Sequence, residues 1–447
     1  MKKYKQHIAD INGRPLDLYT MHNDHGMQVS FLNCGGALCS LHVPDKNGMA
    51  TDVISGYSDL TRYTENPPFF GALVGRVANR IANAEFNIDG KHCRTDKNYE
   101  GRHTLHGGGQ NFSNYFWQVS ETDNGFVLYG LFTPAYDGMP GILSGTVSYT
   151  LESNALNIVY RFTTDEVTIV NITSHPYFNL NGEGNGNILS HRLMLNADFY
   201  LSSGASLIND GAILSVQGTP FDFTVAHKIG ADIHNPHPMM VNAGGGYDLC
   251  YALKDCDAPA AILTGDKSGI EMTVFTNQPG IQLYTSNSLH NEPAKTAGRV
   301  YGKYDFVCLE TQHFPGSEVY SHFPSARLNP GEVYNRCYIS LLAGLLLIIA
   351  FSGYENFVSK MGIKNHEDRP AWMGKVGFSD LKLKLIGAIV AISAIELLKA
   401  FVEIGDGGIE QDILMWKIIV HITFAVSGVL FAVTDLIVAK SKSDGAH

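Results

Sequence analysis

Short runs in which apolar and polar residues alternate fill the first 338 residues of the chain. The clearest pair covers residues 146–151 and 156–162, with a Glu-Ser-Asn-Ala turn between the two runs. Every second residue is large and apolar in both runs, as expected for strands with one buried face. The pair predicts a β-hairpin, and similar runs cover residues 125–132, 191–201 and 270–276.

The number of such runs indicates the fold class. Gly and other turn residues separate the runs, and amphipathic helical patterns are few. Many strands in one unit favour packed antiparallel sheets. The sequence therefore predicts a mainly β domain over residues 1–338, built as a large antiparallel β-sandwich.

The pattern changes near residue 338, where long apolar segments begin. They cover residues 339–351, 383–404 and 413–439. A helix needs about 20 residues to cross the ~30 Å hydrocarbon core of a bilayer. The second and third segments are therefore candidate transmembrane helices, whereas the first is too short. We expect residues 339–447 to form a hydrophobic helical region of membrane type.

Charge in the connecting loops predicts an orientation for these helices. Residues 352–382 carry five Lys or Arg, whereas residues 403–412 carry none. The positive-inside rule then places the basic loop in the cytoplasm. A crossing by residues 339–351 would place the β domain outside, yet the N-terminus shows no signal-peptide core. Either that segment does not span, or the two parts were not built for one another.

Composition excludes some classes of function. Residues 341–447 carry 10 basic and 11 acidic side chains, so nearly all of the net charge of −11 falls in the first 340 residues. An acidic domain without a basic stripe argues against a nucleic-acid partner. The seven cysteines form no Cys-x-x-Cys pair, which indicates reduced thiols in a cytoplasmic chain.

The first candidate for chemistry is Glu310, which follows the apolar run of residues 306–309. A carboxylate at the end of a buried strand has a raised pKa and is a candidate general base. An ordinary solvated Glu is the alternative.

Four further polar groups stand out in the β part. Arg80 and Asn79 lie in Gly-Arg-Val-Ala-Asn-Arg-Ile over residues 75–81, and His106 precedes three glycines. His175 stands beside an aromatic turn, and Asp248 follows a glycine-rich turn. The bland alternatives are a structural arginine, a core histidine and a plain turn aspartate.

Together these residues favour acid/base chemistry on a neutral, polyhydroxylated substrate. We find no serine-nucleophile motif, no nucleotide loop and no metal cluster with ligand spacing in the sequence. Aromatic faces stack on sugar rings, and polar side chains bind the hydroxyl groups.

Six motifs in this order resemble those of the aldose 1-epimerases, also called galactose mutarotases. They are Gly-Arg-Val-Ala-Asn-Arg-Ile (75–81), Leu-His-Gly-Gly (105–108), His-Pro-Tyr-Phe-Asn-Leu (175–180), Tyr-Asp (247–248), Gln-Leu-Tyr-Thr-Ser-Asn (282–287) and Leu-Glu-Thr-Gln-His-Phe-Pro (309–315). The resemblance covers residues 5–338 and implies an antiparallel β-sandwich with an open cleft. It also implies interconversion of the α and β anomers of free hexoses such as glucose and galactose.

The resemblance implies a role for each matching residue. Glu310 corresponds to the general base that takes the proton of the anomeric hydroxyl, and His175 to the general acid that protonates the ring oxygen. Both proton transfers reverse when the ring closes, so no cofactor and no metal is needed. The residues that correspond to sugar-binding positions are Arg80, His106 and Asp248, with Asn79 and Gln312 as weaker candidates.

The C-terminal residues 341–440 resemble a different family, the YqhA-type inner-membrane proteins of uncharacterised function. The match lacks the family's first membrane helix, which accounts for the short segment 339–351. It predicts a cytoplasmic enzyme domain attached to the inner membrane. It also suggests a fusion of two genes' products, or an erroneous gene model. Two alternatives to a mutarotase remain: a catalytically silent carbohydrate-binding module, and a membrane-tethered protein whose function lies in the tail.

Overall fold

The computed structural model describes residues 1–254 and 258–344, together with residues 422 and 426. The chain divides into two units, Met1–Leu347 and Ile348–His447. The predicted membrane segments 383–404 and 413–439 lie outside the described residues, apart from the two isolated positions. No helix among the described residues is long and apolar enough to cross a bilayer.

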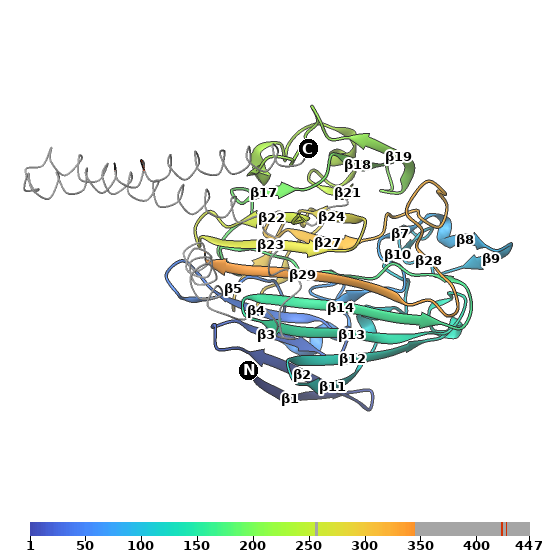
Figure 1. Cartoon of the computed structure of the whole chain (residues 1–447), viewed down its shortest axis with the longest axis horizontal. Helices are drawn as coiled ribbons and strands as arrows, with labels where there is room; N and C mark the ends of the chain where they lie inside the picture. The colour runs from blue at the N-terminus through green and yellow to red at the C-terminus, as the bar shows by residue number, and fades with distance from the viewer. Residues whose placement is uncertain (255–257, 345–421, 423–425, 427–447) are drawn as a thin grey trace, which may run out of the picture. The chain divides into compact units, whose positions relative to one another are not determined.

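Three larger sheets organise the described part of the first unit, and all pairings between their strands are antiparallel (Figure 1). One five-stranded sheet has the order β1 (Lys2–Ile11), β2 (Arg14–His22), β3 (Gln28–Leu32), β4 (Leu38–Pro44), β5 (Ala50–Asp52). The nine-stranded sheet has the order β11 (Gln118–Thr122), β12 (Gly125–Phe132), β13 (Leu143–Glu152), β14 (Ala155–Thr164), β29 (Tyr334–Gly344), β23 (Ile270–Thr276), β22 (Ala261–Thr264), β17 (Arg192–Leu195), β20 (His227–Lys228). The second five-stranded sheet has the order β19 (Asn209–Ser215), β18 (Phe199–Ser203), β21 (Asp248–Ala252), β24 (Gly280–Tyr284), β27 (Cys308–Gln312).

Short elements connect and edge these sheets. The two-stranded pairs are β7 (Arg80–Ile81) with β10 (Thr104–Leu105), β6 (Leu73–Val74) with β16 (Thr173–Ser174), β8 (Glu85–Ile88) with β9 (Lys91–Arg94), β15 (Thr168–Ile169) with β28 (Arg327–Leu328), and β25 (Glu292–Pro293) with β26 (Val300–Tyr301). The helices are α1 (Pro134–Asp137), α2 (Pro238–Asn242) and the 3-10 turns η1 (Leu60–Thr64), η2 (Ala82–Ala84), η3 (Phe112–Asn114) and η4 (Ile229–Ala231).

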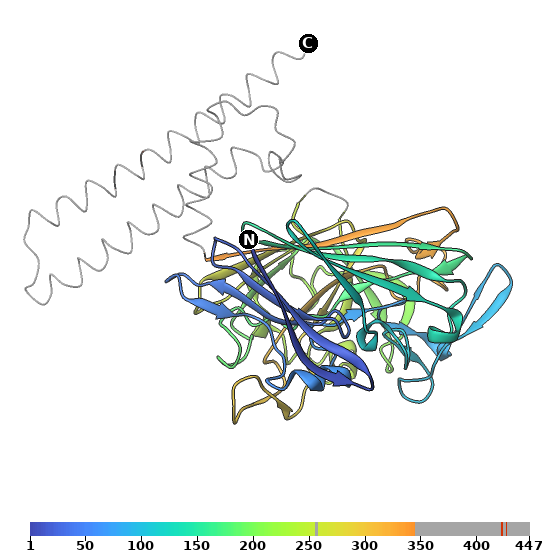
Figure 2. The ribbon, with the colours of Figure 1, turned by 90° about the horizontal axis from the view of Figure 1, so that it is seen from below.

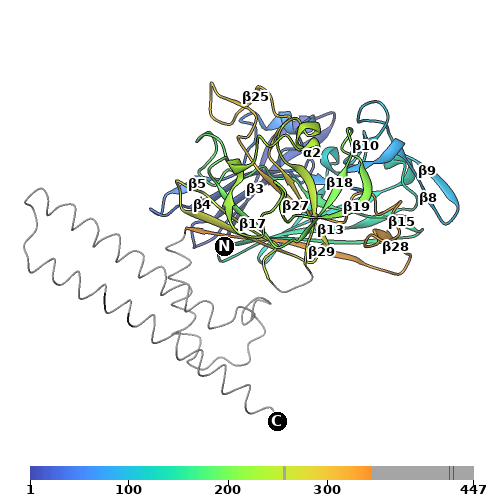
Figure 3. The same cartoon turned by 90° about the horizontal axis from the view of Figure 1, so that it is seen from above.

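The sheets pack face to face around one main hydrophobic core. In Figure 3, β13 and β29 lie along one layer, and β3 and β27 lie along the other. The blue strands of the first sheet pack against the teal strands β11–β14 (Figure 2). Phe31 on β3 meets Tyr149 on β13 edge to face, with ring centroids 4.8 Å apart. The described residues therefore form the mainly β sandwich that the sequence predicts.

The predicted hairpin at residues 146–162 is confirmed. β13 and β14 pair from Leu143 with Thr164 to Glu152 with Ala155. The alternate apolar residues of both strands are buried. Residues 125–132 and 270–276 are single strands, as expected. The prediction of one run over residues 191–201 is wrong, because β17 and β18 divide it between two sheets as the chain crosses from one layer to the other.

The C-terminal strand β29 passes the predicted boundary at residue 338. It continues to Gly344, lies between β14 and β23, and is the orange strand in Figure 1. Tyr338, Ser340 and Leu342 point inward and are buried, whereas Ile339 and Leu341 are half-buried. The helical assignment is therefore wrong for residues 339–344, because two partner strands impose a period of two on this apolar run.

Candidate active site

A cleft of about 460 Å³ opens beside the second five-stranded sheet. One face of that sheet supplies its floor. Antiparallel pairing sets Gln282 opposite Glu310, and Tyr284 opposite both Asp248 and Cys308. Residues that pair directly, and residues two apart on a strand, share a face. Asp248, Gln282, Tyr284 and Glu310 all line the cleft for this reason.

The opposite face of the same strands is apolar. Leu249, Ile281, Leu283 and Leu309 alternate with the polar residues and are buried in the main core. Their burial anchors β21, β24 and β27 rigidly, since a one-residue slip of any strand would exchange the two faces. The carboxyl group of Glu310 is thereby held at a defined position against the cleft.

His175 reaches the same cleft from the loop that follows β16. Phe178 in that loop exchanges two backbone hydrogen bonds with Val307, of 2.8 and 2.9 Å, just before β27 begins. The Asn179 side chain donates to the carbonyl oxygens of Gly186 at 2.7 Å and Asp305 at 2.9 Å. These bonds fasten the segment of His175 to the strand of Glu310.

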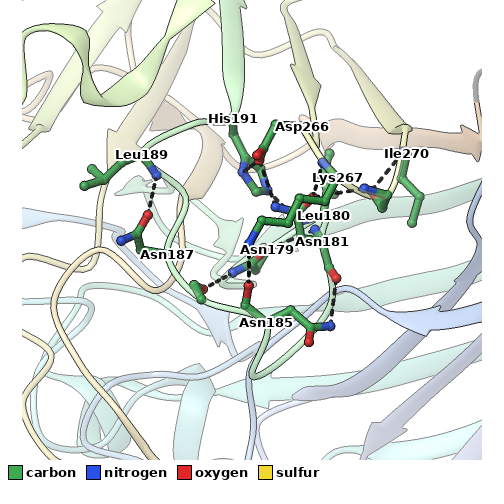
Figure 4. Close-up of polar contacts among 12 residues, drawn as sticks. Asn179, Leu180, Asn181, Asn185, Asn187, Leu189, His191, Asp266, Lys267 and Ile270 are labelled. Atoms are coloured by element: carbon green, nitrogen blue, oxygen red, sulfur yellow. Dashed lines mark hydrogen bonds and ion pairs between the residues drawn. The ribbon is translucent and has the colours of Figure 1, made fainter. Parts of the chain in front are cut away.

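The loop beyond Asn179 has its own polar support (Figure 4). His191, which is fully buried, accepts a hydrogen bond from the Leu180 N–H at 3.0 Å through Nε2. The Asn181 side chain donates to Asp266 at 2.8 Å and accepts from the Lys267 N–H at 2.9 Å. These contacts lie outside the cleft lining and hold the loop's shape.

The Nε2 atom of His175 lies 3.4 Å from the Oε1 atom of Glu310. Both side chains are almost fully buried. Burial raises the pKa of Glu310 well above its usual value, the nearby Asp248 raises it further, and Arg80 lowers it. Burial lowers the pKa of His175 to about 4. Each residue is thus shifted toward its neutral form, so the pair keeps one proton, and the two shifts favour its position on Glu310.

A chain of polar side chains begins at Gln282, which lies opposite Glu310 in the sheet. The Gln282 amide donates to Asp248 Oδ1 at 2.6 Å, and Gln312 donates to Gln282 at 3.5 Å. The Arg80 guanidinium donates to Asp248 Oδ2 at 3.4 Å and to Asn79 Oδ1 at 3.3 Å. Of these residues, Gln312 is outside the cleft lining.

His106 completes the donor set from the β7–β10 side. Its Nδ1 accepts a hydrogen bond from the Asn79 N–H at 3.2 Å. Burial, His175 and Arg80 hold the pKa of His106 well below its usual value. The neutral ring therefore carries its proton on Nε2, where it is a hydrogen-bond donor.

Gly107 permits this close approach of the His106 loop to the motif at residues 75–81. Its φ is +90°, and a Cβ atom there would lie 2.2 Å from the carbonyl oxygen of Gly75. Any larger residue would displace His106 from Asn79.

Arg76 and Arg80 have different surroundings, although they share one motif. Arg76 is fully buried and forms an ion pair with Asp137 at 2.9 Å. It also donates to the backbone carbonyls of Phe132, Pro140 and Gly141. Arg76 is therefore the structural arginine of the two, and Arg80 lines the cleft.

The structure brings six of the seven residues predicted from the sequence to one cleft: Asn79, Arg80, His106, His175, Asp248 and Glu310. Among the other lining residues, which had no predicted role, are Phe69, Tyr99 and Gln282. Tyr99 lies under the Arg80 guanidinium at 4.7 Å from its ring centroid, and Phe69 meets His106 at 4.8 Å between centroids. Gln282 is the first residue of the motif at residues 282–287, so the sequence marked it. The sequence did not predict its hydrogen bond to Asp248.

Comparison with known proteins supports a sugar-isomerase relationship. A family profile described as aldose 1-epimerase matches residues 17–338, and one described as uncharacterized protein family UPF0114 matches residues 333–401. The chain is 37% identical to the galactose mutarotase of Mus musculus over 325 residues, which is 72% of this chain and 93% of that protein. It is 32% identical to the aldose 1-epimerase of Escherichia coli K12, over 72% of this chain and 94% of that protein.

Solved structures agree with this relationship. The structure of galactose 1-epimerase from Lactobacillus acidophilus has a TM-score of 0.67 and 26% identity, and the match covers 76% of this chain and 98% of that one. The aldose epimerase homologue from C. elegans has the same TM-score and 27% identity, and the match covers 73% of this chain and 98% of that one.

Proposed function

The chain belongs to the aldose 1-epimerase family and is a carbohydrate isomerase, and we propose that Glu310 and His175 carry the proton transfers by which it interconverts the α and β anomers of free hexoses. The observation that carries this assignment is the 3.4 Å approach of His175 Nε2 to Glu310 Oε1 inside the cleft. The anomeric hydroxyl and the ring oxygen of an aldose are bonded to the same carbon. A base and an acid that serve both oxygens must therefore lie side by side.

The reacting form has the proton of the pair on His175 and none on Glu310. The pKa shifts favour the reverse in the empty cleft, so the proton first passes from Glu310 to His175 across their 3.4 Å contact. Glu310 takes the proton of the anomeric hydroxyl while His175 gives its proton to the ring oxygen, so the bond between C1 and that oxygen breaks. C1 becomes an aldehyde carbon, and rotation about C1–C2 presents its other face. The ring oxygen then attacks C1, His175 takes back its proton, and Glu310 returns a proton to the new anomeric hydroxyl. Both groups end as they began.

The remaining cleft residues hold the sugar in this scheme. Arg80 and the Nε2–H of His106 donate hydrogen bonds to hydroxyl groups, and Asp248 accepts from them. Asn79 and Gln282 orient Arg80 and Asp248 through the bonds described above. Gln312, which is outside the cleft lining, acts through its contact with Gln282. The substrates we propose are glucose and galactose, of which galactose appears in the names of the relatives.

Polarimetry of freshly dissolved α-D-glucose tests the assignment. We expect the chain to accelerate the change in optical rotation and the Glu310→Gln variant to lose the acceleration. A carbohydrate-binding module without catalysis would bind sugar in calorimetry and leave the rotation rate at that of buffer. Retention of the full rate by Glu310→Gln would exclude Glu310 as the base.

We also propose that the C-terminal region attaches the enzyme to a membrane and derives from a second protein family. The two family profiles overlap at residues 333–338, which supports a junction inside β29. The apolar segments 383–404 and 413–439 are long enough to span a bilayer. Fractionation of cells would test the attachment, since a full-length product found entirely in the detergent-free soluble fraction contradicts it. Sequencing of the locus and detection of a full-length product would separate a true fusion from an erroneous gene model.

A further inference from the structure

Cys308 is a buried thiol beside the proposed acid/base pair. It stands two residues before Glu310 on β27, so its side chain lies on the same face of the strand. Cys308 is fully buried. This burial raises the pKa of its thiol, and the nearby Glu310 and Asp248 raise it further. The proton transfers described above do not use this thiol.

The donor atoms of His175, Cys308 and Glu310 lie within 4.8 Å of one another. This is an imidazole nitrogen, a thiol sulfur and a carboxylate oxygen, from two segments that backbone hydrogen bonds fasten together. Among the described residues, His175 Nδ1 and Glu310 Oε2 are buried and have no hydrogen-bond partner. These two atoms of the pair therefore make no hydrogen bond within the described protein.

The spacing of these donors fits a tetrahedral ion. Zinc binds imidazole nitrogen and carboxylate oxygen at about 2.0–2.2 Å, so two such ligands at a tetrahedral angle lie roughly 3.4 Å apart. The His175 Nε2 to Glu310 Oε1 distance is 3.4 Å. A zinc–thiolate bond of about 2.3 Å puts the sulfur roughly 3.6 Å from each of the other ligands. The Cys308 sulfur lies within 4.8 Å of the other two donor atoms, so it must move closer to them to reach that distance.

We infer that His175, Cys308 and Glu310 form an inhibitory site for a zinc-type divalent ion at the floor of the sugar cleft. Thiolate and imidazole ligands select zinc over magnesium, which prefers six oxygens. The ion displaces the thiol proton of Cys308 and the proton shared by His175 and Glu310, and both protons leave to the buffer. It then occupies the two groups that would transfer protons to and from the sugar. The fourth position is left for water.

The effect of the ion on turnover rests on the proposed roles of Glu310 and His175, whereas its binding does not. Binding is therefore measured directly, by adding Co²⁺ to the purified full-length chain. A cysteine thiolate bound to Co²⁺ gives a near-ultraviolet charge-transfer band. We expect this band in the unmodified chain and in Cys93→Ala, a matched buried thiol from a separate hydrophobic cluster. We expect the band to be absent from Cys308→Ala and weakened in Glu310→Gln.

Inhibition is measured by polarimetry with Zn²⁺, each variant being compared with its own zinc-free rate and an enzyme-free blank. We expect Zn²⁺ to inhibit the unmodified chain, a chelator to restore its rate, and Mg²⁺ at the same concentration to have no effect. Cys308→Ala should raise the zinc concentration for half-inhibition roughly ten-fold or more. Cys308→Ser, which nearly preserves the side-chain volume but supplies no thiolate, should do the same if the alanine variant fails to fold.

Two results would overturn the inference. One is an equal zinc sensitivity of the unmodified chain and the Cys308 variants. The other is a cobalt–thiolate band that persists without Cys308. Failure of the proposed function gives a different result, namely full mutarotase activity in Glu310→Gln. The cobalt–thiolate band still reports metal binding in that case, because it does not depend on activity.

Discussion

His175 Nε2 and Glu310 Oε1 lie 3.4 Å apart, and neither the second nitrogen nor the second oxygen of the pair has a hydrogen-bond partner among the described residues. A buried acid/base pair usually has its remaining polar atoms satisfied. Both residues line the cleft, so a ligand bound there is the partner that would satisfy these atoms. The pair also has opposed pKa shifts, raised for the carboxylic acid and lowered for the imidazole. Such opposed shifts are typical of sites that move protons.

Replacement of Glu310 by Gln should abolish nearly all of the acceleration. The amide keeps the shape of the carboxylate but cannot accept the proton of the anomeric hydroxyl. General acid/base groups contribute about 10²- to 10⁴-fold to a rate, and we expect kcat to fall by a factor in this range. Polarimetry on α-D-glucose gives the rate, and a circular dichroism spectrum equal to that of the unmodified chain excludes misfolding. The control variant is Asn87→Asp, which exchanges an amide and a carboxylate at an exposed position on β8. It should keep the full rate.

The same Glu310→Gln variant should be more stable than the unmodified chain at neutral pH. The folded-state pKa of Glu310 is raised, so stability from this group is complete below its ordinary value of 4.5 and is lost as pH rises through the raised pKa. Gln cannot ionise and avoids this loss. Thermal melts between pH 4 and 8 would reveal a gain that grows as pH rises. A variant that is less stable at pH 8 than at pH 4, relative to the unmodified chain, would contradict the raised pKa.

Much of the cleft was predictable because its residues stand in short local motifs. Asp248 begins β21 and His175 follows β16, as the local patterns suggest. The prediction that Glu310 stands at a strand end is wrong, because it lies in the middle of β27, where pairing continues to Gln312. The pairing of Gln282 with Asp248 was not predictable. It depends on the register of β21, β24 and β27, which lie far apart in sequence. Register is set by burial of the alternate leucines against other sheets, so no local pattern contains it.

Two other differences between prediction and structure have similar causes. Arg76 and Arg80 differ because the irregular segment between them has no fixed period, so their environments depend on tertiary contacts. Residues 339–344 are apolar enough for a helix or a strand, and hydropathy alone does not separate the two. The open positions beside β14 and β23 decide in favour of the strand.

Asp248→Asn should shift the acidic limb of the pH–rate profile to lower pH. Burial is the main cause of the raised pKa of Glu310, and the charge of Asp248 is the second. Loss of that charge lowers the pKa, so Glu310 remains an ionised base in more acidic solution. The measurement is the pH dependence of kcat/KM, which reports the free enzyme. KM should also rise, because Asp248 is a proposed sugar ligand. Asp10→Asn, at an exposed carboxylate, is the matched control and should leave the limb in place. A limb that moves to higher pH would contradict the repulsion.

Arg76→Met and Arg80→Met should separate stability from substrate binding. Arg76 and Asp137 are both buried, and loss of one partner of a buried ion pair costs about 3–5 kcal/mol. Arg76→Met should therefore lower the free energy of unfolding by about that amount, with little change in KM for the folded fraction. Arg80→Met should raise KM and leave the melting temperature nearly unchanged. Denaturant titration and initial-rate polarimetry give the two quantities. Addition of Asp137→Leu to Arg76→Met should restore part of the stability, because it removes the uncompensated charge.

Leu342→Ala should destabilise the β domain, although residue 342 lies beyond the residues matched by the aldose 1-epimerase profile. Leu342 is fully buried on β29 and pairs with Met272 on β23. Leu→Ala at a buried position costs about 2–5 kcal/mol, through lost apolar contact and the cavity that remains. Leu341→Ala is the matched control, since its side chain is half-buried on the other face of the same strand. Its cost should be clearly smaller.

Truncation tests the same contribution of β29 at a larger scale. A chain that ends at residue 338 loses the pairing of residues 339–344 with both neighbouring strands, whereas a chain that ends at residue 344 keeps it. The shorter chain should melt at a lower temperature and lose its mutarotase activity at lower denaturant concentrations. Equal melting temperatures of the two truncated chains, together with equal effects of Leu341→Ala and Leu342→Ala, would show that the domain is complete at residue 338. A lower melting temperature for the chain that ends at residue 338 would mean that residues 339–344, which lie outside the aldose 1-epimerase profile, complete the nine-stranded sheet.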